Sequence, residues 1–297
     1  MQKAGNHHHE PDSKRLGMAI LFNAAITLAE AIGGMISGSM SLLSDAAHNL
    51  SDVISLIISF LAARLSRRKA TERETFGFRR SEILAAFINS STLIIISVII
   101  FVEAIRRLMN PVEISSGLMI WLAVASILVN GLSALLIHKD SHDNMNMRAA
   151  YLHLFGDMLT SVAVLAGGLA IRYLKWYWTD PLFSLLIAVY LLWLSWGIFR
   201  SSLRIIMQFT PEEIDVSKIA REIEKIPGVK NIHHVHVWQI NDHDFMFEAH
   251  VDMYEDIKVS NFEEILEKIK VVLARNAINH STIQPEFSVD DKKKIIY

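Results

Sequence analysis

The sequence Ser-Asp-Ala-Ala-His-Asn-Leu-Ser-Asp, at positions 44–52, lies inside an apolar run that extends from Met40 to Leu65. The run has the length and composition of a membrane-spanning helix, yet it contains His48 and Asp52. A charged side chain in the middle of a membrane costs roughly 2.5–3.5 kcal/mol on insertion scales, so such residues usually have a function. The i, i+4 spacing places this imidazole and this carboxylate on one face of the helix.

A second His/Asp pair with the same spacing occurs about a hundred residues later. The sequence Tyr-Leu-His-Leu-Phe-Gly-Asp at positions 151–157 places His153 and Asp157 in another apolar run. One such pair is often only a polar contact between helices. Two pairs in hydrocarbon must face each other, an ion or a cavity. Side by side, they would present two nitrogens and two carboxylates to one point, which is a tetrahedral ligand set that zinc accepts.

The composition is that of a multi-span membrane protein. Of the 297 residues, 52% are hydrophobic and 20% are charged, and the mean hydropathy is +0.31. This is too apolar for an ordinary soluble domain. The net charge of -2 gives no indication of nucleic-acid binding, and the absence of cysteine excludes disulfides and thiolate metal sites.

Six apolar segments follow a polar tail at residues 1–15, and each is long enough to cross a bilayer as a helix. They span residues 17–37, 40–65, 82–105, 117–137, 147–174 and 181–199. We therefore expect a helical membrane domain over residues 16–207. The tail contains His7, His8 and His9, which are either a native metal-attracting sequence or an artificial remnant, and it does not resemble a cleaved signal peptide.

Basic residues indicate how these segments are oriented. Arg and Lys are frequent at residues 64–80, before the first segment, between the fourth and fifth, and after the sixth. The opposite side has only Arg106, Arg107, Arg172 and Lys175. By the positive-inside rule, both termini are expected in the cytoplasm.

Residues 208–297 are more charged and predict a small soluble domain of order αββαβ. A helical stripe from Val216 to Ile226 ends at Pro227-Gly228, and alternating patterns over 229–240 and 245–253 indicate strands. Ser260-Asn-Phe-Glu263 is a capping box that starts a second helix, and 281–289 alternates again. We expect an open sheet with helices on one face, and association of copies because the core is small.

Further candidate ligands lie outside the two intramembrane pairs. The loop residues His138, Asp140, His142 and Asp143 could collect a cation at the cytoplasmic mouth, although a solvated polar loop explains them nearly as well. In the soluble domain, alternation places Glu248 and His250 on one strand and Gln284 and Glu286 on another, each on a face turned away from the apolar residues. A metal site on this exposed strand face and a merely hydrated polar face are both compatible with that pattern.

Two polar residues of the membrane segments allow more than one interpretation. Glu30 could line a water-filled path or bond to a neighbouring helix, and Asp45 is more compatible with a structural bond than with metal ligation.

Four motifs together resemble the cation diffusion facilitator family, in particular its bacterial zinc/cobalt/cadmium efflux branch. They are Ser-Leu-Leu-Ser-Asp-Ala-Ala-His-Asn-Leu-Ser-Asp at 41–52, Thr-Phe-Gly-Phe-Arg-Arg-Ser-Glu-Ile-Leu-Ala-Ala at 75–86, Arg-Ala-Ala-Tyr-Leu-His-Leu-Phe-Gly-Asp at 148–157 and Val-His-Val-Trp at 235–238. The resemblance extends from Gly17 to Val289. It implies a homodimer in the inner membrane, a cytoplasmic metallochaperone-like domain, and proton-coupled export of Zn²⁺, with Cd²⁺ and Co²⁺ also expected, by alternating access.

The resemblance also implies ligands. His48, Asp52, His153 and Asp157 match the family's transport site, and His233 and His250 match metal-binding positions of its soluble domain. Gln284 and Glu286 stand where some members have His and Asp, so His233, His250 and Glu286 are the expected ligands there. A further site that some members have between the second and third helices is expected to be absent or weak, because Glu72, Glu74 and Phe78 replace its pattern.

Two alternatives belong to other functional classes. An intramembrane zinc metalloenzyme needs an open coordination position and a general base, typically in His-Glu-x-x-His, and the sequence lacks that motif. We therefore expect no enzyme. A membrane-anchored metal sensor would bind metal without transporting it.

Overall fold

The computed structural model describes residues 13–138, 145–241, 243–290 and 293–296. The side chains of residues 13–20, 136–137, 145–150 and 153 are outside this description. The predicted His7–His9 sequence and the predicted loop ligands Asp140, His142 and Asp143 therefore lie outside the described residues.

The six apolar segments all form long helices, as predicted. These are α1 (Ser13–Ser37), α2 (Met40–Ser66), α3 (Ser81–Met109), α4 (Ser116–His138), α5 (Met145–Leu174) and α6 (Thr179–Ile206). Over the described residues, the last five are long and apolar enough to cross a membrane, and the described apolar part of α1, Leu21–Ser37, is shorter. The membrane-spanning helical fold is thus confirmed.

The chain divides into two compact units, each described separately below. One contains residues up to 57 together with 89–197, and the other contains 58–88 together with 198–297. The division falls within α2, α3 and α6, so each of these helices contributes to both units.

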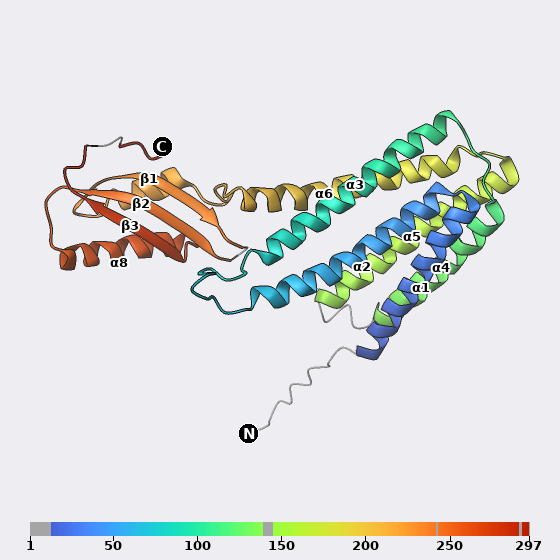
Figure 1. The fold of residues 1–297 in the computed structure, drawn as a ribbon, viewed down its shortest axis with the longest axis horizontal. Coiled ribbons are helices and arrows are strands. Elements are labelled where there is room, and N and C mark those ends of the chain that lie inside the picture. Colours follow the sequence, from blue (N-terminus) through green and yellow to red (C-terminus); the bar gives the residue numbers. More distant parts are fainter. Residues whose placement is uncertain (1–12, 139–144, 242, 291–292, 297) are drawn as a thin grey trace, which may run out of the picture. The chain divides into compact units, whose positions relative to one another are not determined.

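In the first unit, α4 packs along α5, and α1 packs along α4 (Figure 1). Leu42 of α2 is buried with Met119 of α4 and Val164 of α5. Gly168 of α5 lies very close to Ile120 of α4. A Cβ atom at position 168 would lie only 2.9 Å from Cγ1 of Ile120, so glycine permits this close contact between the two helices.

The second unit contains the predicted αββαβ domain. Its elements are α7 (Val216–Ile223), β1 (Val229–Gln239), β2 (Phe245–Met253), α8 (Val259–Arg275) and β3 (His280–Glu286). The strand order is β1-β2-β3, with β1 antiparallel and β3 parallel to β2. Since parallel neighbours need a crossover connection, α8 supplies the link between β2 and β3.

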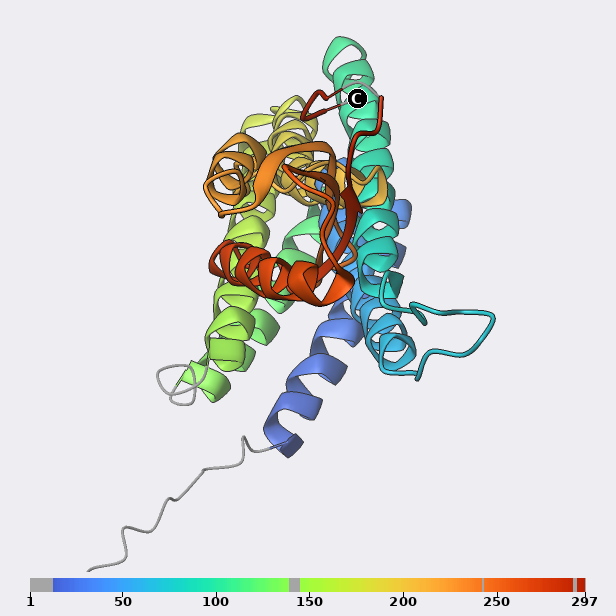
Figure 2. The ribbon, with the colours of Figure 1, turned by 90° about the vertical axis from the view of Figure 1, so that its left-hand side faces the viewer.

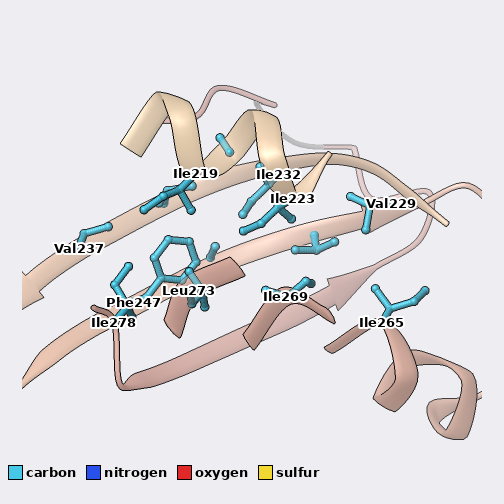
Figure 3. Close-up of a cluster of buried hydrophobic side chains, with 14 of the residues drawn as sticks. Ile219, Ile223, Val229, Ile232, Val237, Phe247, Ile265, Ile269, Leu273 and Ile278 are labelled. Carbon is cyan, nitrogen blue, oxygen red and sulfur yellow. The ribbon is translucent and has the colours of Figure 1, made fainter. Parts of the chain in front are cut away.

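Both helices of this domain lie on the same side of the sheet (Figure 2). Ile219 and Ile223 of α7 and Ile269 and Leu273 of α8 pack with Phe247 of β2 in one core (Figure 3). These apolar side chains recur at the helical spacing that the sequence shows. The opposite face of the sheet is left for polar side chains.

Strand β1 is irregular where its polar side chains gather. The pairing with β2 shifts register between His233 and His236, and His234 has a left-handed φ of 52°. The backbone N–H groups of His234 and Val235 donate hydrogen bonds to the carbonyl oxygens of Lys294 (3.1 Å) and Ile295 (2.8 Å). The last described residues therefore lie along β1, and bulges of this kind re-aim side chains near functional sites.

Candidate metal sites

Three of the four predicted intramembrane ligands come together between α2 and α5. The Nε2 atom of His48 lies 3.6 Å from Oδ2 of Asp52 and 4.0 Å from Oδ1 of Asp157. His48 and Asp157 are buried. We call His48, Asp52 and Asp157 the transmembrane cluster.

The fourth predicted ligand, His153, lies on α5 one turn before Asp157. Its side chain is outside the described residues. The i, i+4 spacing places the two residues on one helix face.

Asp180 fixes the start of the helix that carries His48. It lies in the first turn of α6, is fully buried, and accepts hydrogen bonds at the N-terminus of α2. The donors are the hydroxyl of Ser39 (2.6 Å), the backbone N–H of Met40 (2.7 Å), and the backbone N–H (3.1 Å) and hydroxyl (2.6 Å) of Ser41. A carboxylate satisfies the free N–H groups there and interacts favourably with the helix dipole. The sequence analysis missed this role.

Asp45 joins α2 to α5 next to the transmembrane cluster. Its Oδ1 accepts a hydrogen bond from Thr160 (2.8 Å) and its Oδ2 accepts one from Ser161 (3.3 Å). These two donors follow Asp157 by three and four residues. The bond therefore holds the two helices at the register in which His48 faces Asp157, and the expected structural role of Asp45 is confirmed.

Glu30 of α1 is also fully buried. The polar side chains of Ser126 in α4 and Asn49 in α2 face this carboxylate. The two interpretations that the sequence left open, a water-filled path and a bond to a neighbouring helix, therefore both stay open. Of the predicted loop ligands, only His138 is described, and its ring lies 5.1 Å from the ring of Tyr151.

The second predicted ligand set comes together in the C-terminal domain. Oε1 of Glu286 lies 2.7 Å from Nδ1 of His250, and Oε2 lies 3.2 Å from Nε2 of His233. One ligand atom from each residue lies within 4.8 Å of the others. We call His233, His250 and Glu286 the C-terminal cluster.

The donor chemistry of the C-terminal cluster fits zinc, which accepts imidazole and carboxylate ligands. Nδ1 of His233 lies 2.9 Å from the side-chain oxygen of Asn231, which cannot donate a hydrogen bond. In the tautomer that carries its proton on Nδ1, this contact is a hydrogen bond to Asn231 and the lone pair of Nε2 is available to a metal ion. Outer partners of this kind orient metal ligands.

The expected exposure of this strand face is found only in part, because Glu248 and Gln284 are exposed and His250 is half-buried, whereas Glu286 is buried. His233 is fully buried, and Glu286 and its β2 neighbour Asp252 are nearly so. Alternation correctly placed His250 and Glu286 on one face of the sheet. It contains no information about the C-terminal segment, which lies along β1 and whose Lys293 contacts Asp252 and Glu286. Asp252 was also missed, although its position two residues after His250 was a usable signal.

The fold defines a multi-span membrane protein that contains a cluster of histidine and aspartate side chains between two of its membrane helices. The chain belongs to the cation efflux family. Residues 16–207 match the family model of the cation efflux transmembrane domain, and residues 211–288 match that of the cation efflux protein cytoplasmic domain. Proteins of this family are transporters, so the expectation that the chain is not an enzyme is confirmed.

Several curated proteins are similar over nearly their whole length. The "Cadmium, cobalt and zinc/H(+)-K(+) antiporter" of Bacillus subtilis is 39% identical over 283 residues, covering 95% of this chain and 91% of that protein. The "Zinc transporter ZitB" of Escherichia coli is 37% identical, with coverage of 93% and 88%. The "Metal cation efflux system protein CzcD" of Cupriavidus metallidurans is 33% identical, with coverage of 96% and 90%.

Proposed function

We propose that the protein exports divalent transition-metal cations, above all Zn²⁺, from the cytoplasm in exchange for protons by alternating access. The names of the three relatives, which include zinc transport and antiport with H⁺, support this substrate class. The membrane domain ends at residue 207, and the C-terminal domain begins at 208. The protein lies in the inner membrane with both termini in the cytoplasm, where the positive-inside rule puts its basic loops.

The substrate ion binds at His48, Asp52, His153 and Asp157. The observation that carries this proposal is the approach of His48 to Asp157, 4.0 Å apart on different helices of a membrane-spanning domain. A doubly charged ion compensates the two carboxylates, which are costly to hold in hydrocarbon without a partner. Two imidazoles and two carboxylates complete a tetrahedral shell.

The same ligands explain the choice of ion. Mg²⁺ and Ca²⁺ prefer six or more oxygen ligands, so a four-ligand site containing nitrogen disfavours them. The chain has no cysteine, so it lacks the thiolates that select copper(I). Cd²⁺ and Co²⁺ are accepted together with Zn²⁺, as the name of the Bacillus subtilis relative indicates for that protein.

Proton coupling follows from competition for lone pairs. Zinc binds only deprotonated imidazole and carboxylate groups, so each binding event releases protons. Histidine changes protonation in the physiological pH range, so protons from the outer side can compete with the metal for it. Protonation of the ligands from outside releases the metal, and the return of the empty carrier brings the protons inward.

The C-terminal cluster holds a second, structural or regulatory Zn²⁺, and the protein is a homodimer. Support for the ion comes from the convergence of His233, His250 and Glu286. Support for the dimer comes from the match to the family's cytoplasmic domain and from the small core of this domain, because small domains gain stability by association.

Reconstituted vesicles with a zinc dye and a pH dye test the transport proposal. The wild-type protein is expected to show zinc flux together with opposite proton flux. His153→Ala is expected to abolish both, whereas Glu113→Gln, a change at an exposed carboxylate outside the helices, retains both. Zinc binding without flux in the wild type would favour the membrane-anchored sensor instead.

A further inference from the structure

A positively charged side chain already lies inside the C-terminal cluster. Nζ of Lys293 is 3.1 Å from Oδ1 of Asp252, 3.2 Å from Oε2 of Glu286 and 3.4 Å from Nε2 of His233. Three acceptors from all three strands therefore surround one ammonium group, which has three protons to donate.

Two of these acceptors are the atoms that would bind a metal ion. The lone pair on Nε2 of His233 can accept a hydrogen bond from the ammonium group or coordinate a cation, but it cannot do both at once. The same applies to the Oε2 lone pair that faces Lys293. The ammonium group of Lys293 and a divalent ion therefore compete for one position.

The two carboxylates of Asp252 and Glu286 favour a cation at the position that Lys293 occupies. Asp252 and Glu286 are paired residues on neighbouring strands and are both buried. Two buried carboxylates side by side repel each other strongly in a low-dielectric environment. One lysine compensates one of their charges, whereas one divalent ion compensates both.

Backbone contacts keep the lysine next to the cluster. The carbonyl oxygens of Lys294 and Ile295 accept hydrogen bonds from β1, and Ile295 packs against the domain core. The side chain of Lys293 itself is 27% exposed. It is therefore tethered at a high local concentration, yet it can leave the cluster by rotation of its own flexible stem.

We propose that Lys293 is a tethered competitor for the metal site of the C-terminal domain, and that a divalent ion binds only by displacing its ammonium group. The proposal rests on the proposed metal site of this domain. Lys293 lowers the affinity of the C-terminal cluster and thereby sets the metal concentration at which the cluster fills. When Lys293 leaves, Asp252 loses its ammonium partner and compensates the charge of the incoming ion.

Zinc titration of the full-length protein in nanodiscs against a competing chelator tests this proposal. The wild-type protein and His250→Ala are titrated in parallel, and the zinc ion that binds to the wild type but not to His250→Ala is assigned to the C-terminal site. Lys293→Met keeps roughly the length of the side chain and removes its charge. In this variant the affinity of the C-terminal site for zinc is expected to rise about 10-fold or more, since hydrogen bonds to charged groups are strong. Lys294→Met is the matched control, because its side chain is exposed and its carbonyl bond is unchanged.

Thermal unfolding supplies a second measurement that does not depend on counting metal. With a chelator present, Lys293→Met is expected to unfold at a lower temperature than the wild type, because Asp252 and Glu286 lose their counter-charge. With zinc present, the stabilisation by zinc is expected to be larger in Lys293→Met than in the wild type. Lys293→Arg, which retains a positive charge, is expected to stay closer to the wild type in both measurements.

Unchanged zinc affinity in Lys293→Met would overturn the proposal, and weakened affinity would show that Lys293 positions the ligands instead. If His250→Ala removes no zinc even in the Lys293→Met background, the metal site itself is absent and the inference fails with it. That result is distinguishable from a failure of the transport proposal, because transport is measured separately by vesicle flux in His153→Ala.

Discussion

The transmembrane cluster and the C-terminal cluster contain the same ligand types in very different surroundings. His48 and Asp157 lie in a membrane-spanning domain, held by Asp45 and by the helix start at Asp180. His233 and Glu286 lie on a sheet next to a lysine. The comparison teaches that ligand identity alone does not determine a metal site's function. In our proposals the two clusters also differ in what competes for the ligands, which is protons in the transmembrane cluster and the ammonium group of Lys293 in the C-terminal cluster.

The largest expected effect separates transport from binding. Asp157→Ala is expected to reduce zinc-for-proton exchange in vesicles to background, because it removes a carboxylate from the transmembrane cluster. His250→Ala is expected to retain most of the exchange while losing the zinc-dependent stabilisation of the C-terminal domain. Calorimetry of metal stoichiometry and vesicle flux should be measured on both variants. Equal loss of transport in both would show that the two clusters are not functionally distinct.

Asp180→Asn tests how strongly the transmembrane cluster depends on the position of α2. Each donor left without an acceptor in this buried site costs about 1–3 kcal/mol, so lower thermal stability and partial loss of flux are expected. Ser39→Ala removes only one donor to Asp180 and should have a smaller effect on both. The reverse ranking of these two variants would contradict the role given to Asp180.

Acid should weaken zinc binding at both clusters, but the measurable consequences differ. Metal binds deprotonated imidazole and carboxylate groups, so zinc binding at the C-terminal cluster should weaken as the pH falls. Outside acid should instead accelerate zinc export, because it releases the ion from the transmembrane cluster. Titrations at several pH values and flux under imposed pH gradients measure the two trends. Slower export with outside acid would exclude competition by protons.

The smallest expected effect concerns the contact between the α2–α3 loop and the C-terminal domain. Arg79 lies 3.0 Å from Asp244, and its side chain is more than half exposed. Exposed ion pairs contribute about 0.2–1 kcal/mol, so Arg79→Ala should change the unfolding temperature little and leave zinc affinity unchanged. A large change in flux would show that this loop couples the C-terminal domain to transport.

The accuracy of the sequence analysis differed between the two regions for a physical reason. In hydrocarbon, His48 and Asp157 are conspicuous because few charged residues are tolerated there, so their meeting was predictable. On a soluble sheet, polar residues are common, and alternation allowed either a metal site or a hydrated face. It identified His250 and Glu286, but it missed Asp252 and the burial of Glu286.

The sequence by itself determined the six apolar helices, the αββαβ order of the C-terminal domain and the family, because these depend on local periodicity and on motifs that need no partner. Only the tertiary structure decided that Asp180 bonds to the start of α2, 140 residues away along the chain from Met40. It also decided that Lys293 lies among Asp252, Glu286 and His233. Contacts between distant segments depend on how the elements pack, and no local pattern encodes that packing.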